Sequence, residues 1–93
     1  MPPTSEPLWR DVTIVNELGL HARAAAKLAK LAQQAAGAVW LQAGQERIDA
    51  KQVIDILTLA AGKGDRVQIV METTADLATL DLIVALFADG FGE

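Results

Sequence analysis

The sequence contains no cysteine and no tyrosine, and its 93 residues include a single histidine, His21. Without cysteine there is no disulfide framework, no thiol nucleophile and no thiolate metal site. A single histidine also argues against a zinc cluster, so we expect neither a metal nor a cofactor. Aromatic residues make up only 4% of the chain. We therefore expect a core of thin layers of Leu, Ile and Val.

The chain also lacks a surplus of basic residues and a long apolar run. Its net charge of −4 argues against a general nucleic-acid binder. No run approaches the roughly 20 apolar residues of a membrane span. Residues 1–7 lack the basic and apolar regions of a secretory signal, and we expect them to be a disordered lead-in to one domain over residues 8–93. These features are typical of a soluble, cytoplasmic protein without membrane insertion.

Hydrophobic periodicity predicts seven elements in the order β-α-β-β-α-β-α. Period-two alternation predicts strands, and apolar stripes at helical spacing predict helices. The economical arrangement is an α+β fold in which three helices cover one face of a four-stranded antiparallel sheet. The predicted strands cover residues 8–16, 38–42, 46–48 and 66–71. The predicted helices cover residues 22–36 and 74–89, with a short helix between them that starts at the segment 49–52 and runs to about residue 60.

Local signals predict where the helices begin and end. Gly37 is a natural stop for the first helix. Asp49 and Gln52 resemble the two ends of a capping box at the start of the second helix. Gly90 would end the last helix, with Phe91 folding back on it in a Schellman-type closure.

His21 stands where a strand-like segment gives way to a helical one, shortly after Gly19, which permits left-handed backbone. A helix start presents unpaired N–H groups and a partial positive charge, and both attract phosphate. No Ser, Thr, Asp or Asn occupies the obvious cap position, so we expect this end to be open to an anion. Arg23 follows in the first turn, where a cation is unfavourable unless an anion is bound. An imidazole beside such donors is suited to accept a phosphoryl group.

The residues alone leave other interpretations open. His21 could be an ordinary surface or core histidine. Lys27 and Lys30 lie on the same side of the helix as Arg23, and they form either a solvated face or a docking site for an acidic partner. Three apolar residues of the second helix either belong to the core or form a small exposed patch for a partner. These three residues are Val53, Ile54 and Leu57.

Two segments resemble the signatures of the HPr-type histidine phosphocarriers of the bacterial phosphotransferase system. Gly19–Leu28 (GLHARAAAKL) resembles the phosphorylation-site motif, and Ala50–Leu59 (AKQVIDILTL) resembles the second signature. The resemblance runs in register from about Val12 to Phe91. The ending from Ile83 to Phe91 is similar to the nitrogen-branch carriers in particular. The resemblance implies an HPr-like open-faced β-sandwich and a phosphohistidine intermediate.

By this resemblance, His21 would accept a phosphoryl group on Nδ1 from a phosphoenolpyruvate-charged enzyme I and pass it to a histidine of a IIA-type protein. Arg23 would contact the phosphoryl oxygens together with the N–H groups of the helix start. The chain would be a monomeric covalent relay rather than an enzyme with its own small-molecule substrate. The resemblance also implies a partner-docking surface, formed by Ala22, Ala26, Gln52, Val53, Ile54 and Leu57.

Three residues depart from the family's pattern. Ala24 replaces the proline that usually follows the motif arginine. Because proline fixes the backbone angle φ at a helix start, alanine leaves the first turn less rigid, and we expect altered rates of phosphoryl transfer. Leu18 stands where the family often has Asn or Ser, which removes a polar contact to the phosphorylated ring. Gln52 replaces the regulatory serine of many members, which excludes kinase control at that position.

A second functional class stays open, a regulatory binding module that keeps the fold and docks partners without transferring phosphate. Ala24 and Leu18 favour this alternative. A small nucleic-acid-binding domain is disfavoured by the charge balance. Sugar uptake and nitrogen-branch regulation are both compatible with the sequence.

Overall fold

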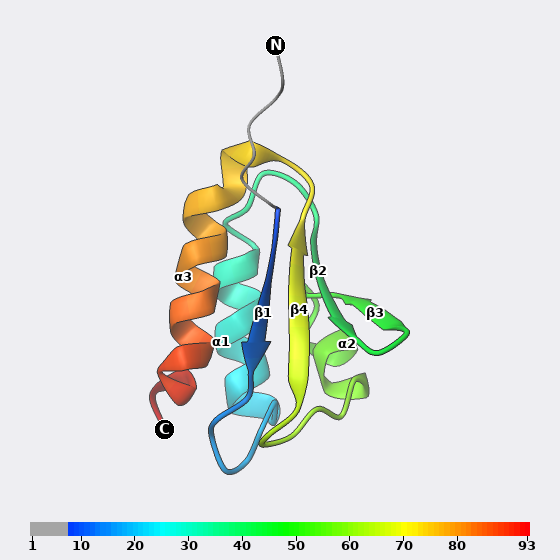
Figure 1. Ribbon diagram of the computed structural model, residues 1–93, viewed down its shortest axis with the longest axis vertical. Coiled ribbons are helices and arrows are strands. Elements are labelled where there is room, and N and C mark those ends of the chain that lie inside the picture. Colours follow the sequence, from blue (N-terminus) through cyan, green and yellow to red (C-terminus); the bar gives the residue numbers. More distant parts are fainter. Residues whose placement is uncertain (1–7) are drawn as a thin grey trace.

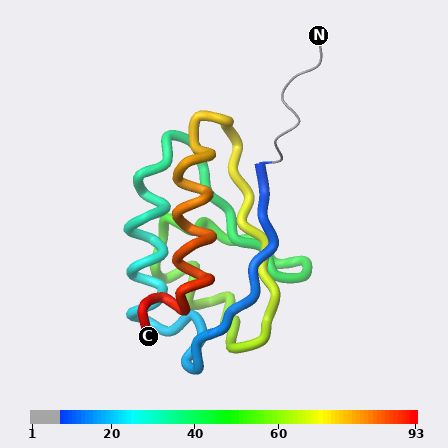
Figure 2. The backbone as a smooth tube through the Cα atoms, turned by 60° about the vertical axis from the view of Figure 1, so that its left-hand side comes forward, coloured from blue at the N-terminus to red at the C-terminus, as the bar shows by residue number. Residues whose placement is uncertain are grey.

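The protein, described over residues 8–93 by a computed structural model, has a four-stranded antiparallel sheet with helices on one face (Figures 1 and 2). The spatial order of the strands is β1-β4-β2-β3. The predicted α+β class and the order β-α-β-β-α-β-α are confirmed. The lead-in expected for residues 1–7 lies outside the described residues. The strands are β1 (Trp9–Thr13), β2 (Val39–Ala43), β3 (Glu46–Asp49) and β4 (Arg66–Met71).

Three α-helices and two short 3-10 helices complete the fold. The α-helices are α1 (Ala22–Ala32), α2 (Val53–Thr58) and α3 (Leu77–Ala88). The 3-10 helix η1 (Thr74–Asp76) precedes α3, and η2 (Gly90–Gly92) follows it. None of the helices within residues 8–93 is long and apolar enough to cross a membrane.

The core lies between the inner face of the sheet and the helices. In β4, Val67, Ile69 and Met71 are buried and alternate with less buried residues, as expected for a sheet with one face toward water. The buried side of α1 consists mostly of alanine, which lets this helix approach its neighbours closely. It is formed by Ala24, Ala25, Leu28, Ala29 and Ala32. The core is therefore mostly aliphatic, as predicted, with one phenylalanine from α3 (Phe87) and one from η2 (Phe91).

The predicted helix boundaries are partly wrong. Helix α1 ends at Ala32 rather than near residue 36, so Gly37 does not stop it. The chain after α1 is instead held by the buried carboxylate of Asp76, which accepts the N–H groups of Ala36 at 2.7 Å and Gly37 at 2.8 Å. Asp76 lies 39 residues from Gly37 along the chain, so no local pattern predicts these bonds.

The predicted capping box of α2 is also wrong. Asp49 is the last residue of β3, and its carboxylate accepts the N–H of Lys51 at 2.9 Å. Gln52 is the N-cap residue of α2 and makes no side-chain capping bond. Pairing with Trp40 of β2 keeps Asp49 in the sheet, so it cannot also open the helix.

Candidate functional site

A tight turn presents His21 at the start of α1. Gly19 has a φ of +62°, and a Cβ placed there would lie 2.7 Å from both the carbonyl oxygen of Ala61 and the Cα of Gly62. The side-chain amide of Asn16 donates to the carbonyl of Gly19 at 2.9 Å. Glycine is therefore required here both for its backbone conformation and for the close approach of the loop after α2.

His21 itself is the N-cap residue of α1. Its carbonyl accepts the N–H of Ala25 at 2.8 Å, and its Nδ1 accepts the N–H of Arg23 at 3.4 Å. The expectation that this helix end has no side-chain acceptor is thus wrong, because the imidazole takes that role. A backbone N–H can only donate, so Nδ1 carries the lone pair and points it at the helix start. At 3.4 Å this bond is long and weak, so an incoming anion can displace it.

The other ring nitrogen of His21 is held by Glu93. The distance from Nε2 to Oε2 of Glu93 is 2.7 Å, and the two side chains are 24% and 16% exposed. Partial burial raises the pKa of Glu93, but the hydrogen bond and charge of His21, with smaller effects of Asn16 and Arg23, outweigh it. The pKa of this carboxyl therefore lies below its ordinary value. The ring lies at the mouth of the helix and is in part open to solvent.

Arg23 and Lys27 follow His21 on the exposed side of α1, and the structure separates their roles. Within residues 8–93 no ion pair holds the exposed guanidinium of Arg23, which lies close enough to Glu93 to lower the pKa of that carboxyl. Lys27, in contrast, donates from Nζ to the carbonyl of Phe91 at 2.6 Å. Lys27 is thus a structural contact, whereas Arg23 is available to a ligand.

The six residues of the predicted docking surface come from two helices that pack together, α1 and α2. Ile54 is 70% exposed and Leu57 is 37% exposed, so neither is a core residue. Val53 is half-buried against the core, and the other three positions, Ala22, Ala26 and Gln52, are exposed. Leu18, just before the turn, is also 70% exposed. The exposed apolar members of this set thus lie at the surface of two helices that pack together.

Two contacts at the site were missed by sequence reasoning, those of Glu93 and Asn16. Glu93 lies 72 residues from His21 along the chain, and no local pattern links them. The chain end nevertheless lies beside the start of α1 (Figures 1 and 2). For Asn16, a polar residue where strand alternation stops is a signal that could have been used.

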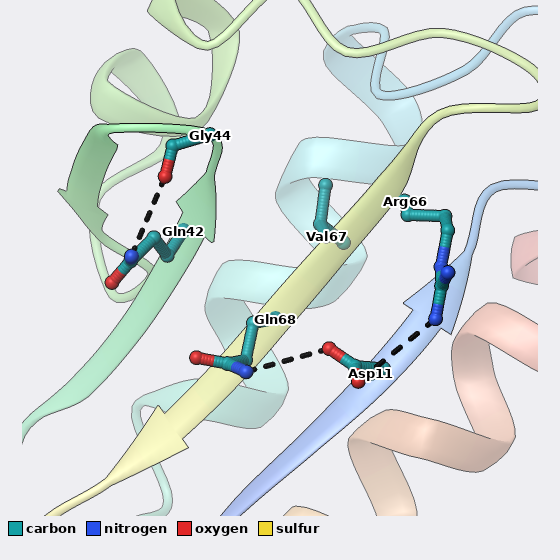
Figure 3. A pocket seen from close by; sticks show the side chains of 6 residues that line it. All are labelled: Asp11, Gln42, Gly44, Arg66, Val67 and Gln68. Carbon is teal, nitrogen blue, oxygen red and sulfur yellow. Dashed lines mark hydrogen bonds and ion pairs between the residues drawn. The ribbon is translucent and has the colours of Figure 1, made fainter.

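A polar hollow of about 200 Å³ lies on the open face of the sheet, where Asp11, Arg66 and Gln68 meet (Figure 3). These side chains interact with one another: Gln68 donates to Asp11 at 3.4 Å, and Arg66 lies 4.0 Å from the same carboxylate. Neither His21 nor Arg23 lines it. Residues 8–93 contain no group of three or more His, Cys, Asp or Glu side chains that could hold a metal ion.

Comparison with known proteins gives a consistent result. A family model described as the PTS HPr component phosphorylation site matches residues 9–89. The phosphocarrier protein HPr of Cupriavidus necator is 41% identical over 92% of this chain and 97% of its own length. The phosphocarrier protein NPr of Shewanella violacea is 40% identical over 92% of this chain and 94% of its own length.

Solved structures agree with the sequence matches. The crystal structure of HPr-C-His from Thermoanaerobacter tengcongensis superposes with a TM-score of 0.86 and 27% identity, covering 91% of this chain and 96% of that one. The chain therefore belongs to the HPr family of phosphocarriers of the phosphotransferase system, and its fold is the open-faced β-sandwich that the resemblance implied. It is about equally similar to a relative named HPr and to one named NPr.

Proposed function

We propose that this protein relays a phosphoryl group through His21, from a phosphoenolpyruvate-charged enzyme I to a histidine of a IIA-type protein. The observation that carries the proposal is the position of Nδ1 at the start of α1, where it accepts only one weak hydrogen bond, from the N–H of Arg23 at 3.4 Å. An arriving phosphoryl group displaces that bond, and its oxygens take over the N–H donors of the helix start. The guanidinium of Arg23 supplies a second contact to the same oxygens.

The balance of the site suits a carrier. Phosphate must bind well enough to transfer but not so well that onward transfer stalls. Backbone donors and one exposed arginine offer moderate stabilisation, in an open position that a partner protein can reach. Six residues, Ala22, Ala26, Gln52, Val53, Ile54 and Leu57, are proposed as the docking surface, since exposed apolar side chains such as Ile54 and Leu57 favour a protein partner. The same surface serves donor and acceptor in turn, which fits a monomer acting in the cytoplasm.

The relay is tested by incubating the protein with phosphoenolpyruvate and a matching enzyme I, followed by intact mass measurement and acid treatment. We expect a gain of one acid-labile phosphoryl group that is absent in His21→Ala. No gain in the unaltered chain would support a binding module that docks partners without transfer. Measuring which IIA-type proteins of the same cell accept phosphate from the charged chain then assigns it to sugar uptake or to nitrogen-branch regulation.

A further inference from the structure

We propose that Glu93 is a positioning residue, whose carboxylate keeps the ring proton of His21 on Nε2 and so leaves Nδ1 free to receive the phosphoryl group. This inference rests on the proposed relay. It starts from the shortest contact of the imidazole, the 2.7 Å hydrogen bond between Nε2 and Oε2 of Glu93. An ionised carboxylate can only accept, so Nε2 must carry the proton.

The hydrogen-bond partners of the two ring nitrogens therefore favour the same tautomer, the one with its proton on Nε2. The N–H of Arg23 requires an acceptor at Nδ1, and the carboxylate of Glu93 requires a donor at Nε2. Turning the ring over would place a carbon against the carboxylate and forfeit that bond. Because the bond from Arg23 is 3.4 Å long, we infer that Glu93 makes the larger contribution to orienting the ring.

The segment that carries Glu93 is held in place by two contacts of Phe91. Phe91 is fully buried and packs edge-on against Phe87, with ring centroids 4.9 Å apart. The φ of Phe91 is +60°, a left-handed conformation that only surrounding contacts can maintain for such a side chain. Lys27 donates to the carbonyl of Phe91 at 2.6 Å. The carboxylate is thus presented to His21 by a packed and hydrogen-bonded segment.

Asn16 completes the arrangement from the other side. Its amide nitrogen donates to the carbonyl of Gly19 at 2.9 Å and lies 3.5 Å from Oε1 of Glu93. Because the carbonyl of Gly19 and Oε1 of Glu93 are both acceptors, the amide nitrogen of Asn16, and not its oxygen, must point toward them. Its oxygen is buried and has no hydrogen-bond partner among the described residues. One side chain thus connects the turn that presents His21 with the carboxylate that orients it.

The tautomer matters for the transfer step. Nδ1 uses its lone pair to form the new N–P bond while the N–P bond of the donor phosphohistidine breaks and its electron pair returns to the donor ring. The proton on Nε2 stays where it is, and the phosphorylated ring becomes cationic. The negative carboxylate of Glu93 lies next to the ring and stabilises that developing positive charge. If the proton were on Nδ1 instead, the nitrogen facing the helix start would have no lone pair to offer.

The test measures the tautomer directly. In the full-length ¹⁵N-labelled chain, long-range ¹H–¹⁵N spectra in alkaline buffer distinguish the protonated from the unprotonated ring nitrogen. We expect the unaltered protein to have its proton on Nε2. In Glu93→Gln, the population of the tautomer protonated on Nδ1, relative to the one protonated on Nε2, should rise at least about fivefold. The reason is that a charge-assisted hydrogen bond has been replaced by a neutral one. Glu93→Asp, which keeps the charge on a shorter side chain, should recover part of the difference.

The matched control is Glu72→Gln. Glu72 also accepts a hydrogen bond from a ring nitrogen, that of Trp40 at 2.8 Å, but on the open face of the sheet. It should leave the His21 signals unchanged. Identical tautomer ratios in the unaltered chain and in Glu93→Gln would overturn the proposal, even if phosphoryl transfer proceeds normally. Conversely, a chain that accepts no phosphate but shows the tautomer shift would refute the relay and leave the positioning role intact.

Discussion

The backbone N–H of Leu20 donates to the carbonyl of Ala61 at 3.0 Å, so the turn that presents His21 is tied to the loop after α2. The same loop passes so close to Gly19 that no side chain fits between them. The orientation of the imidazole therefore depends on a contact between two loops as well as on the helix that it caps.

Gly19→Ala tests this dependence. The added methyl group would lie 2.7 Å from backbone atoms of Ala61 and Gly62, at a φ of +62° that disfavours any side chain. We expect a loss of more than about 2 kcal/mol in the free energy of unfolding, measured in urea, because strain and steric overlap add. Gly44→Ala is the control: its φ is +59°, but nothing lies within 4 Å of the added Cβ. It should cost only about 1 kcal/mol. Equal losses would mean that the loop contact is unimportant.

Arg23→Ala should slow phosphoryl transfer and leave folding nearly intact. The side chain is exposed and no ion pair within residues 8–93 holds it, so its removal leaves the core untouched. Loss of one charged contact to the phosphoryl oxygens should reduce the transfer rate about 10-fold to 100-fold. Lys30→Ala, an exposed cation in the last turn of the same helix, should transfer at the normal rate. Unfolding of Arg23→Ala would show instead that the arginine is structural.

Ile54→Glu should weaken docking without unfolding the protein. Ile54 is 70% exposed, and a surface substitution of this kind changes the free energy of unfolding by about 0.5 kcal/mol or less. A carboxylate placed in an apolar contact would raise the KM for enzyme I at least about fivefold, since it must be desolvated without a partner. Leu82→Glu introduces the same change at another exposed apolar residue, on α3. A similar rise in KM for both variants would contradict the proposed surface.

Asp76→Asn should make stability less dependent on pH in acid. Hydrogen bonds from the N–H groups of Gly37 and Ala36 lower the pKa of this buried carboxyl below its ordinary value, against the opposing effect of burial. A carboxyl with a lowered folded-state pKa stabilises the protein above its unfolded pKa, and that contribution is lost as pH falls through the folded value.

The urea midpoint of Asp76→Asn should accordingly lie below that of the unaltered chain at about pH 7. This gap between the two midpoints should narrow as the pH falls below about 4. The matched control is Asp81→Asn, an exposed position near the same end of α3, which should shift the midpoint little. A gap that stays constant down to pH 2 would show that the carboxylate charge is not what holds the loop after α1.

The sequence by itself determined the elements, their order and the family motif that makes His21 the candidate phosphoryl acceptor. These follow from local patterns: alternation marks β4 from Arg66 to Met71, and the motif around His21 matches a family model. Tertiary structure decided how the ring is held. The carboxylate of Glu93, the amide of Asn16 and the loop at Ala61 reach His21 or its turn from distant parts of the chain. Periodicity records which face of an element is buried, whereas the pairing of side chains from different elements is settled only when the elements pack.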